Sequence, residues 1–256
     1  MTVKGLKKQL MAAIAMVLVS VIALGSSTYA WFSMNTQVTA KGMSVTAKSD
    51  STFLLIGDSA SDVSSIQTAK SIEADGTAAT AALYPTAHNS DVTNITTAEA
   101  ATSGNLTNWW YSYSTDPADD GETDNLVSNG GETKFSIATT DIGKYILVNE
   151  FHITTAAGSN ELENLRVASC TIATSGDAAV KVLVAGANGC EEFSGAGGAG
   201  SGTAYLQTAN VTDAAVSTVK VYIYWDGQDD DVNTNNIDQL LETTVQVVFT
   251  GDVVNS

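Results

Sequence analysis

Apolar residues follow two different patterns in this chain, and the change falls near residue 30. Residues 10–24 form an uncharged apolar run, which follows a segment with three lysines. The run is shorter than the roughly 20 residues that a membrane-spanning helix needs, and it fits the core of a signal peptide. The sequence therefore predicts an N-terminal hydrophobic signal helix within residues 1–30, in contact with the membrane only before cleavage.

The residues after the apolar run are typical of a signal-peptidase site. Thr28 and Ala30 place small side chains third and last before a cut between Ala30 and Trp31. An uncleaved anchor is the alternative, because Trp31 and Phe32 extend the apolar region towards the membrane interface. A further alternative is a leader that resembles those of type IV pilins and archaellins. It would be cut after Gly5, and the apolar helix would stay in the filament subunit.

Strict alternation begins directly after this site. Polar residues occupy every second position, which is the period of a strand with one buried face. Gly42 interrupts the alternation, as expected for a bulge or bend, and the pattern resumes at Met43. We therefore expect residues 31–48 to form an N-terminal assembly strand. The residues on its more apolar face are Phe32, Met34, Thr36, Val38 and Ala40.

Several later segments have the same two-residue period. In one of them Val219, Val221 and Ile223 share a face, while Lys220 and Tyr222 share the other. Thr and Val favour such strands, and Gly, Asn, Asp and Ser favour the turns between them. The pattern predicts a single all-β domain over residues 31–256, with long loops. The expected strands cover residues 52–56, 134–138, 144–155, 165–174, 179–185, 219–225 and 245–249.

Two stretches lack clear periodicity. Residues 57–132 are rich in Ala, Ser, Thr and Asp, and we expect a loop-rich insertion there. Residues 186–202 are rich in Gly and Ala, and they lack the following Lys of a phosphate-binding loop, so they predict a flexible connection. The aromatic segment NWWYSY, residues 108–113, lies inside the insertion. Core packing is the expected role of this segment, and a sugar-stacking platform is the alternative.

The charge of the chain is strongly one-sided. It has 11 Lys and Arg against 28 Asp and Glu, a formal net charge of −17. Such a surface repels nucleic acid and anionic lipid, so nucleic acid is not an expected partner. Acidic and amide side chains are concentrated in residues 226–238, where they predict either oxygen ligands for calcium or an ordinary solvated turn. The candidate calcium ligands are Asp226, Asp229, Asp230, Asp231 and Asn233.

The two cysteines allow two interpretations. In an exported protein Cys170 and Cys190 can form a disulfide, and closing a loop of about 20 residues contributes on the order of 3 kcal/mol. Alternatively, Cys170 is a small buried strand residue, because it alternates in phase with Ala168 and Ile172.

The sequence contains no catalytic constellation. It has no HExxH motif and no G-x-S-x-G elbow, and neither cysteine has a histidine close in sequence. We therefore expect a protein that is not an enzyme and that has no cofactor other than the candidate calcium ion.

Several segments resemble a known group of exported proteins. The stretch STYAWFSMNTQVTAKGMSV resembles the cleavage region of Gram-positive proteins that a SipW-type signal peptidase processes, of which the TasA/camelysin family of biofilm-matrix proteins is an example. The stretches YILVNEFHI, LENLRVASCTI and VKVYIYWDGQDD resemble the β-sandwich portion of related surface proteins. The resemblance implies a jelly-roll-like antiparallel β-sandwich and fibre assembly by donor-strand complementation. The metalloprotease activity described for camelysin does not carry over, because the zinc motif is missing.

These observations predict a secreted structural protein, located outside the cell or at its surface, that forms or decorates extracellular fibres. Its expected partners are further copies of itself and, during export, a signal peptidase. Two alternatives remain open at this stage. One is a calcium-dependent or glycan-binding surface module, and the other is an archaellin-like or pilin-like filament subunit that retains its N-terminal helix.

Overall fold

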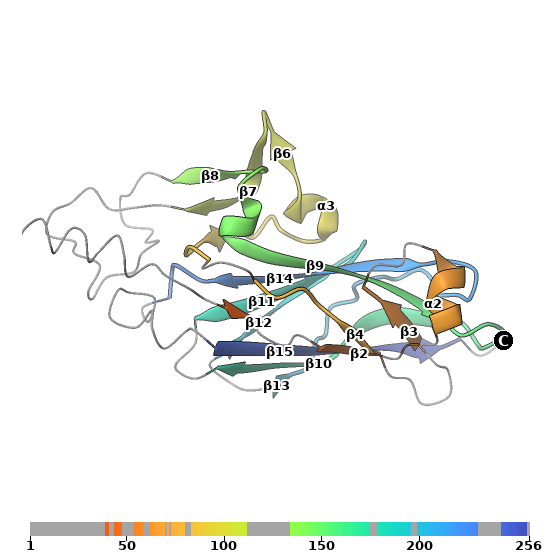
Figure 1. The fold of residues 1–256 in the computed structure, drawn as a ribbon. Coiled ribbons are helices and arrows are strands. Elements are labelled where there is room, and N and C mark those ends of the chain that lie inside the picture. Colours follow the sequence, from red (N-terminus) through yellow and green to blue (C-terminus); the bar gives the residue numbers. More distant parts are fainter. Residues whose placement is uncertain are drawn as a thin grey trace, which may run out of the picture. The chain divides into compact units, whose positions relative to one another are not determined.

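The computed structural model divides the chain into two compact units, residues 1–36 and residues 37–256. The fold belongs to the second unit, whose described strands form three sheets (Figure 1). Most strand pairs are antiparallel, so the predicted all-β class is confirmed. The structure describes residues 39–40, 44–47, 54–58, 62–69, 71, 73–79, 83–111, 134–174, 179–195, 199–229 and 242–254.

Sheet A brings the two ends of the described chain together. In spatial order its strands are β13 (Ala199–Gly200), β10 (Leu162–Thr174), β15 (Glu242–Val253), β2 (Ser44–Ala47) and β4 (Glu73–Asp75), with β1 (Thr39–Ala40) also on β15. The long pair β10 and β15 is antiparallel. In contrast, β1 and β2 both run parallel to β15, and Ser44 lies opposite Gln246. The first and last strands of the described chain are therefore neighbours.

Sheet B is antiparallel throughout its described strands. In spatial order these are β12 (Cys190–Ser194), β11 (Val180–Ala185), β14 (Ser217–Trp225), β9 (Ile146–Thr155) and β3 (Leu54–Gly57). Helix α2 (Val63–Ala69) lies beside β3 and β9, and its Gln67 side chain donates a hydrogen bond to the carbonyl oxygen of Thr155. The short helix η1 (Ile142–Lys144) leads into β9.

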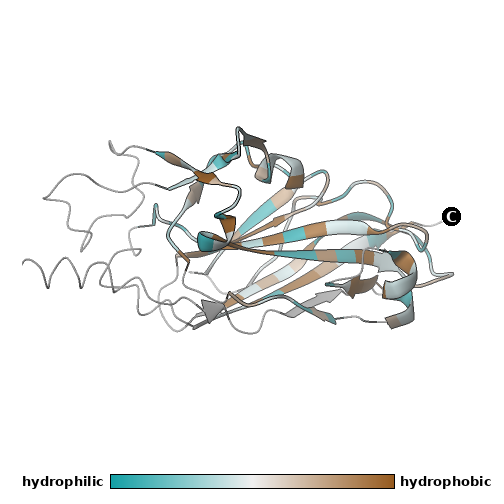
Figure 2. Cartoon of the chain, turned by 45° about the horizontal axis from the view of Figure 1, so that its top comes forward, coloured by the Kyte–Doolittle hydropathy of each residue, from teal (hydrophilic) through white to brown (hydrophobic). Residues whose placement is uncertain are grey.

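One apolar cluster lies between sheets A and B. Along β14 the predicted face is buried in this cluster, and along β15 buried residues alternate with more exposed ones, as predicted. Figure 2 shows hydrophobic and hydrophilic residues alternating along the long strands. Each fully buried Val, Ile or Phe side chain contributes about 1.5–3 kcal/mol of transfer free energy, so this cluster holds the two sheets together. Its members from these two strands are Val219, Val221, Ile223, Trp225, Val245, Val247 and Phe249.

A third sheet, sheet C, occupies part of the stretch that was expected to be loop-rich. Its strands are β5 (Ala87–His88), β6 (Ala101–Thr102), β7 (Asn105–Tyr111) and β8 (Phe135–Ala138). Helix α3 (Ile95–Ala98) is part of the same region, and Asn94 caps its N-terminus through a reciprocal hydrogen-bond pair with Thr97. The described part of residues 57–132 therefore contains regular structure.

The prediction of a flexible connection over residues 186–202 is wrong, because this stretch contains β12 and β13. The segment that follows them lies along the outer edge of β10. Its Leu206 is fully buried, and hydrogen bonds join Leu165 to both Leu206 and Gln207. Gly186 is in close contact with the same segment, since a Cβ atom there would lie only 2.2 Å from the carbonyl oxygen of Leu206. Glycine at this position therefore serves close backbone packing.

We expect Gly186→Ala to lower the free energy of unfolding by about 1–3 kcal/mol, because the added methyl group must displace backbone atoms. Denaturant unfolding measures the change. Gly143→Ala is the matched control, because a Cβ atom at Gly143 meets no atom within 4 Å. Its expected effect is within about 0.5 kcal/mol. Equal stability of the two variants would contradict the close contact.

Candidate functional site

The outer face of sheet B is covered by sheet C and carries the candidate site. Trp109 of β7 is fully buried, and its ring centroid lies 5.9 Å from that of Tyr222 and 5.1 Å from that of Tyr224. Its indole N–H donates a hydrogen bond to the carbonyl oxygen of Ala98. Packing is thus the role of Trp109, as predicted, and its ring also contacts the ring of His88, with the two centroids 5.0 Å apart.

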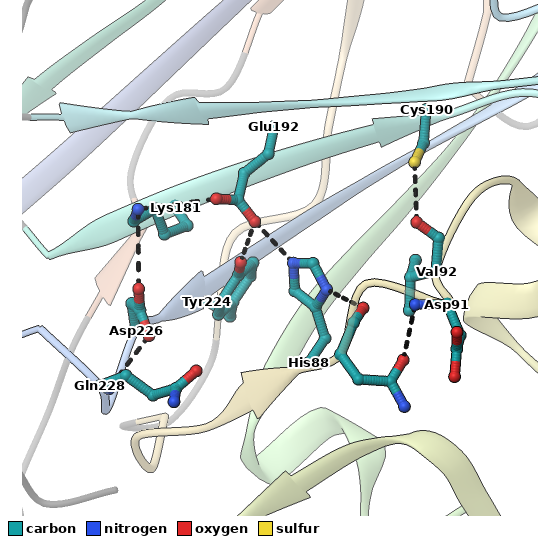
Figure 3. A network of polar contacts seen from close by, with 10 residues as sticks. His88, Asp91, Val92, Lys181, Cys190, Glu192, Tyr224, Asp226 and Gln228 are labelled. Atoms are coloured by element: carbon teal, nitrogen blue, oxygen red, sulfur yellow. Dashed lines mark hydrogen bonds and ion pairs between the residues drawn. The ribbon is translucent and has the colours of Figure 1, made fainter. Parts of the chain in front are cut away.

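Glu192 of β12 is the centre of a polar cluster between sheets B and C (Figure 3). Its Oε2 atom lies 2.6 Å from Nε2 of His88 and accepts a hydrogen bond of 2.6 Å from the hydroxyl of Tyr224. Its Oε1 atom lies 3.6 Å from Nζ of Lys181. The Nδ1 atom of His88 lies 2.9 Å from the carbonyl oxygen of Asn89 and must donate to it. The short contact between Nε2 and Glu192 therefore also requires a proton.

The pKa values of this pair shift in opposite directions. Burial lowers the pKa of His88, but the hydrogen bonds to Glu192 and to Asn89 outweigh it and raise the pKa above the ordinary 6.5. Burial raises the pKa of Glu192, but the hydrogen bonds from His88 and Tyr224 outweigh it and lower the pKa to about 2. An ionised Glu192 beside a protonated His88 is therefore the favoured state near pH 6.

Lys181 of β11 lies between two carboxylates. Its Nζ atom is 3.6 Å from Oδ2 of Asp226, the residue directly after β14, as well as 3.6 Å from Glu192. The side chains of Lys181 and Asp226 are only 19% and 21% exposed. Burial raises the pKa of Asp226 above the ordinary 3.8, and it outweighs the hydrogen bond from the backbone N–H of Gln228. One lysine thus faces a carboxyl group whose pKa is raised and another whose pKa is lowered.

A second lysine on the same face makes shorter ion pairs. Nζ of Lys220 lies 2.6 Å from Oε1 of Glu99 and 3.0 Å from Oε2 of Glu150. The hydroxyl of Tyr222 also donates to Glu99, at 3.3 Å. Burial lowers the pKa of Lys220, but the hydrogen bonds to the two glutamates outweigh it and raise the pKa. Because Glu99 follows α3, this cluster also links sheet B to the region of sheet C.

Sequence reasoning missed the residues of the Glu192 cluster. Glu192 lies in the stretch that was predicted to be a flexible connection, and its partner His88 is 104 residues away. The one available signal was the second face of β14. Lys220, Tyr222 and Tyr224 alternate with apolar residues on a strand that is almost wholly buried, which indicates a covered polar face.

Most of the predicted N-terminal site lies outside the described residues. This applies to the cleavage site at Ala30 and Trp31, and to the greater part of the assembly strand. Of the residues on the predicted face, Ala40 belongs to β1, where it pairs with Thr243. The positions outside the description are Phe32, Met34, Thr36 and Val38.

Only part of the candidate calcium loop is described. Asp226 faces Lys181, and Asp229 donates its backbone N–H to the carbonyl oxygen of Asp226. Within the described ranges, no group of three or more His, Cys, Asp or Glu side chains is arranged to hold a metal ion. The other candidates, Asp230, Asp231 and Asn233, lie outside the described residues.

Of the two interpretations of the cysteines, the structure agrees with separate thiols, since both Cys170 and Cys190 are free. The reason is their placement, since Cys170 lies in β10 of sheet A and Cys190 begins β12 of sheet B. Burial raises the pKa of Cys170 to about 12, in agreement with the alternative of a small buried residue. The thiol of Cys190 donates to the carbonyl oxygen of Val92, and burial, followed by nearby glutamates, raises its pKa.

Comparison with known proteins identifies no relative: no family model, no curated protein and no solved structure matches this chain. In the part of the chain that the structure describes, no helix is long and apolar enough to cross a membrane.

We expect the contribution of the His88–Glu192 pair to the free energy of unfolding to depend on pH along a bell-shaped curve. A raised folded-state pKa means that the contribution of His88 is complete below pH 6.5 and is lost as the pH rises further. A lowered folded-state pKa means that the contribution of Glu192 is complete above pH 4.5 and is lost as the pH falls towards 2. We expect the stabilisation by this pair to be largest between these two limits, as measured by denaturant unfolding across the pH range.

The variant His88→Gln tests the upper pH limit, above which the stabilisation by His88 is lost. It should be less stable than the unmodified chain near pH 6, and the difference should shrink as the pH rises above 6.5, because the unmodified chain then loses its charged pair. Tyr224→Phe is the control, since it removes one hydrogen bond to Glu192 and keeps His88. An unchanged difference between His88→Gln and the unmodified chain from pH 6 to pH 9 would show that the pair does not titrate in this way.

Proposed function

We propose that this protein is a secreted structural subunit that forms or decorates extracellular fibres by donating its N-terminal strand to the next copy. The observation that carries the proposal is the parallel pairing of β1 and β2 with β15. In the sequence, this strand region follows closely after the expected cleavage site, so export would free the strand for assembly.

The connectivity of sheet A favours strand exchange. An antiparallel pair can be held by a short hairpin, whereas the parallel strands β2 and β15 lie at opposite ends of the chain. No short connection therefore ties the N-terminal strand to its own copy of β15. The same ladder, from Ser44 opposite Gln246 to Ala47 opposite Phe249, can form with the strand of another copy.

The position of β2 within the sheet explains why a strand from another copy would be bound favourably in its place. It lies between β15 and β4 and pairs with both. If the strand leaves, both neighbours present unpaired backbone N–H and C=O groups, which form a template for another strand. A subunit without its own β2 thus has a strand-shaped site, and a head-to-tail series of such contacts gives an open fibre.

Other features agree with an extracellular structural role. We propose that sheets A and B form a jelly-roll-like sandwich and that residues 1–30 are the signal peptide, as the sequence resemblance implies. The acidic net charge suits a soluble exported subunit. The pairing of Asp226 with Lys181 weighs against the alternative of a calcium module, because it engages one of the candidate ligands.

Cysteine pairs can test strand exchange directly. Neighbouring strands lie about 4.7–4.9 Å apart, within the Cα separation of about 4.4–6.8 Å that disulfides span. We expect fibres grown from an equal mixture of Ser44→Cys and Gln246→Cys chains to contain a disulfide between two different chains. The measurement is non-reducing electrophoresis with peptide mapping, in a Cys190→Ser background. The thiol of Cys170 does not compete near neutral pH, because its pKa is about 12.

Thr244→Cys in place of Gln246→Cys is the register control. Thr244 lies two residues from Gln246 on the same strand, about 6.6 Å further along it and beyond the ladder that joins residues 44–47 to residues 246–249, so it should give little cross-linked dimer. Fibres without the Ser44–Gln246 cross-link between chains would contradict strand donation. If the exported protein neither forms fibres nor binds to them, the proposed function itself is contradicted.

The processing site separates the main proposal from the filament alternative. If a signal peptidase removes residues 1–30, N-terminal sequencing of the exported protein should begin at Trp31. A first residue of Leu6 would instead support an archaellin-like or pilin-like subunit that keeps its apolar helix. Replacement of Ala30 by a bulky residue, as in Ala30→Phe, should block the first cut, because the position before the bond must be small. It should leave the second cut unaffected.

A further inference from the structure

We propose that Lys181 and Asp226 condense to form an amide bond within the chain, and that Glu192 transfers the proton in this reaction. The site is thus a self-modification site, and its product is a covalent link between β11 and the residue that follows β14. The proposal is independent of fibre assembly, since both partners belong to the same copy, Lys181 in β11 and Asp226 directly after β14.

The geometry places the reacting groups together. Lys181 pairs with Tyr224 in the ladder between β11 and β14, so Asp226 lies two residues beyond the register partner of Lys181. Nζ of Lys181 lies 3.6 Å from Oδ2 of Asp226 and 3.6 Å from Oε1 of Glu192, with the lysine between the two carboxylates (Figure 3). Because the groups come from adjacent strands of a packed sheet, little freedom remains to be lost when they react.

The surroundings hold Glu192 in position. Its Oε2 atom is fixed by the hydroxyl of Tyr224 and by Nε2 of His88, both at 2.6 Å, which leaves Oε1 facing the lysine. On the other side, the backbone N–H of Gln228 donates to Oδ1 of Asp226 at 3.0 Å and leaves Oδ2 towards Lys181. The N–H of Gln228 can stabilise negative charge on Oδ1 of Asp226 while Cγ of Asp226 is attacked.

The reaction needs no oxidant and no co-reactant. A proton first moves from the ammonium group of Lys181, through Glu192, to the carboxylate of Asp226, which gives a neutral amine and a neutral carboxylic acid. The nitrogen then attacks Cγ of Asp226 and a C–N bond forms. Glu192 accepts the second proton from nitrogen and returns it to the departing hydroxyl, so the C–O bond breaks and one water molecule leaves. The overall change is an ammonium and a carboxylate converted to an amide and water.

The two carboxyl groups are suited to different roles. Burial raises the pKa of Asp226, which favours the protonated acid that nitrogen can attack. The hydrogen bonds to Glu192 overcome the effect of burial and lower its pKa to about 2, so Glu192 is ionised, and a proton that it takes from nitrogen passes on readily to the less acidic Asp226. Neighbouring groups whose pKa values are driven apart in this way are the usual arrangement of an acid and a base.

The amide also removes an energetic cost. The ion pair of Lys181 and Asp226 is largely buried and, at 3.6 Å, makes no close hydrogen bond, so its attraction offsets little of the lost hydration. A neutral amide has no such charge to hydrate.

Lys220 is a natural comparison within the same sheet face. Its ion pairs are shorter, at 2.6 and 3.0 Å, and both of its carboxylates are more exposed, at 40% and 43%, than Asp226, at 21%; Glu192 lies between, at 35%. The two glutamates also raise the pKa of Lys220 and hold it as an ammonium ion, which is not a nucleophile. The same chain thus contains one lysine placed to react and one that is only paired.

Mass spectrometry of the full chain tests the proposal. We expect the folded chain to be lighter than its sequence by one water molecule. Trypsin should fail to cut after Lys181, and it should yield a branched peptide that joins residues 167–220 to residues 221–256. Lys181→Arg and Asp226→Ala should both have the full mass, while Lys220→Arg should still lose water. A folded chain of full mass, with a normal tryptic cut after Lys181, would overturn the proposal.

The role of Glu192 has its own kinetic test. Chain that is kept in denaturant before the amide bond forms can be refolded to start the reaction. Mass spectrometry then follows the loss of the water molecule with time. We expect Glu192→Gln to slow the reaction by about a hundredfold or more, the usual contribution of a positioned acid or base. Circular dichroism of the refolded variant shows whether it has folded. A folded Glu192→Gln chain that reacts at the unmodified rate would remove Glu192 from the reaction.

A cyclic imide at Asp226 and Gly227 would have the same mass and must be distinguished. It joins no second peptide and does not involve Lys181, so it would persist in Lys181→Arg and would be cleaved by hydroxylamine. Water loss that persists in Lys181→Arg would therefore contradict the amide. Fibre formation by Lys181→Arg tests a separate question, so failure of this proposal and failure of strand donation are distinguishable.

Discussion

The burial of sheet B on both faces is the constraint on which the rest of the structure depends. One face packs against sheet A, and the other is covered by Trp109 and its neighbours from sheet C. A strand such as β14 therefore has no free face on which to place a charge. Lys181 and Lys220 nevertheless lie on the outer face, and each is surrounded by carboxylates from neighbouring strands or from the region of sheet C. The polar clusters are the consequence, because a buried charge without a partner would cost several kcal/mol.

The same burial makes the two clusters chemically different. Around Lys220 both carboxylates lie within 3.0 Å of the lysine, and the result is an ordinary ion pair. Around Lys181 the contacts are longer and the carboxyl groups are more unequal, since Glu192 receives hydrogen bonds from His88 and Tyr224. The proposed reactive contact of Lys181 and the ion pair of Lys220 thus differ in the hydrogen bonds that hold the neighbouring carboxylate, since His88 and Tyr224 contact Glu192 whereas Tyr222 contacts Glu99.

The sequence could predict the strands whose periodicity is strong. Alternation along residues 219–225 located both the strand and its inner face, and β9, β10, β11 and β15 overlap the predicted ranges. It could not predict sheet C, because strands as short as β5 and β6 have two residues each and show no period. It also could not predict the edge strand β12. The surrounding residues are rich in Gly and Ala, and β12 buries only one side chain, that of Phe193, so it shows no alternation. The Glu192 cluster joins residues far apart in sequence, and local patterns contain no information on such pairings.

Sheets A and B have complementary roles in the proposed fibre. Strand donation would connect successive copies through β15, so a pulling force enters each subunit at that strand. Along the chain β14 precedes β15, and Asp226 is the first residue beyond β14. An amide bond at Asp226 would fix the chain to β11 at this point, and a force that peels β15 away could not extend into β14. Non-covalent strand exchange in sheet A and the amide bond after β14 would then together determine how each subunit responds to a pulling force. In the proposed fibre the exchanged strand would be held by hydrogen bonds, and β11 would be joined to the residue after β14 by a covalent bond that hydration does not weaken.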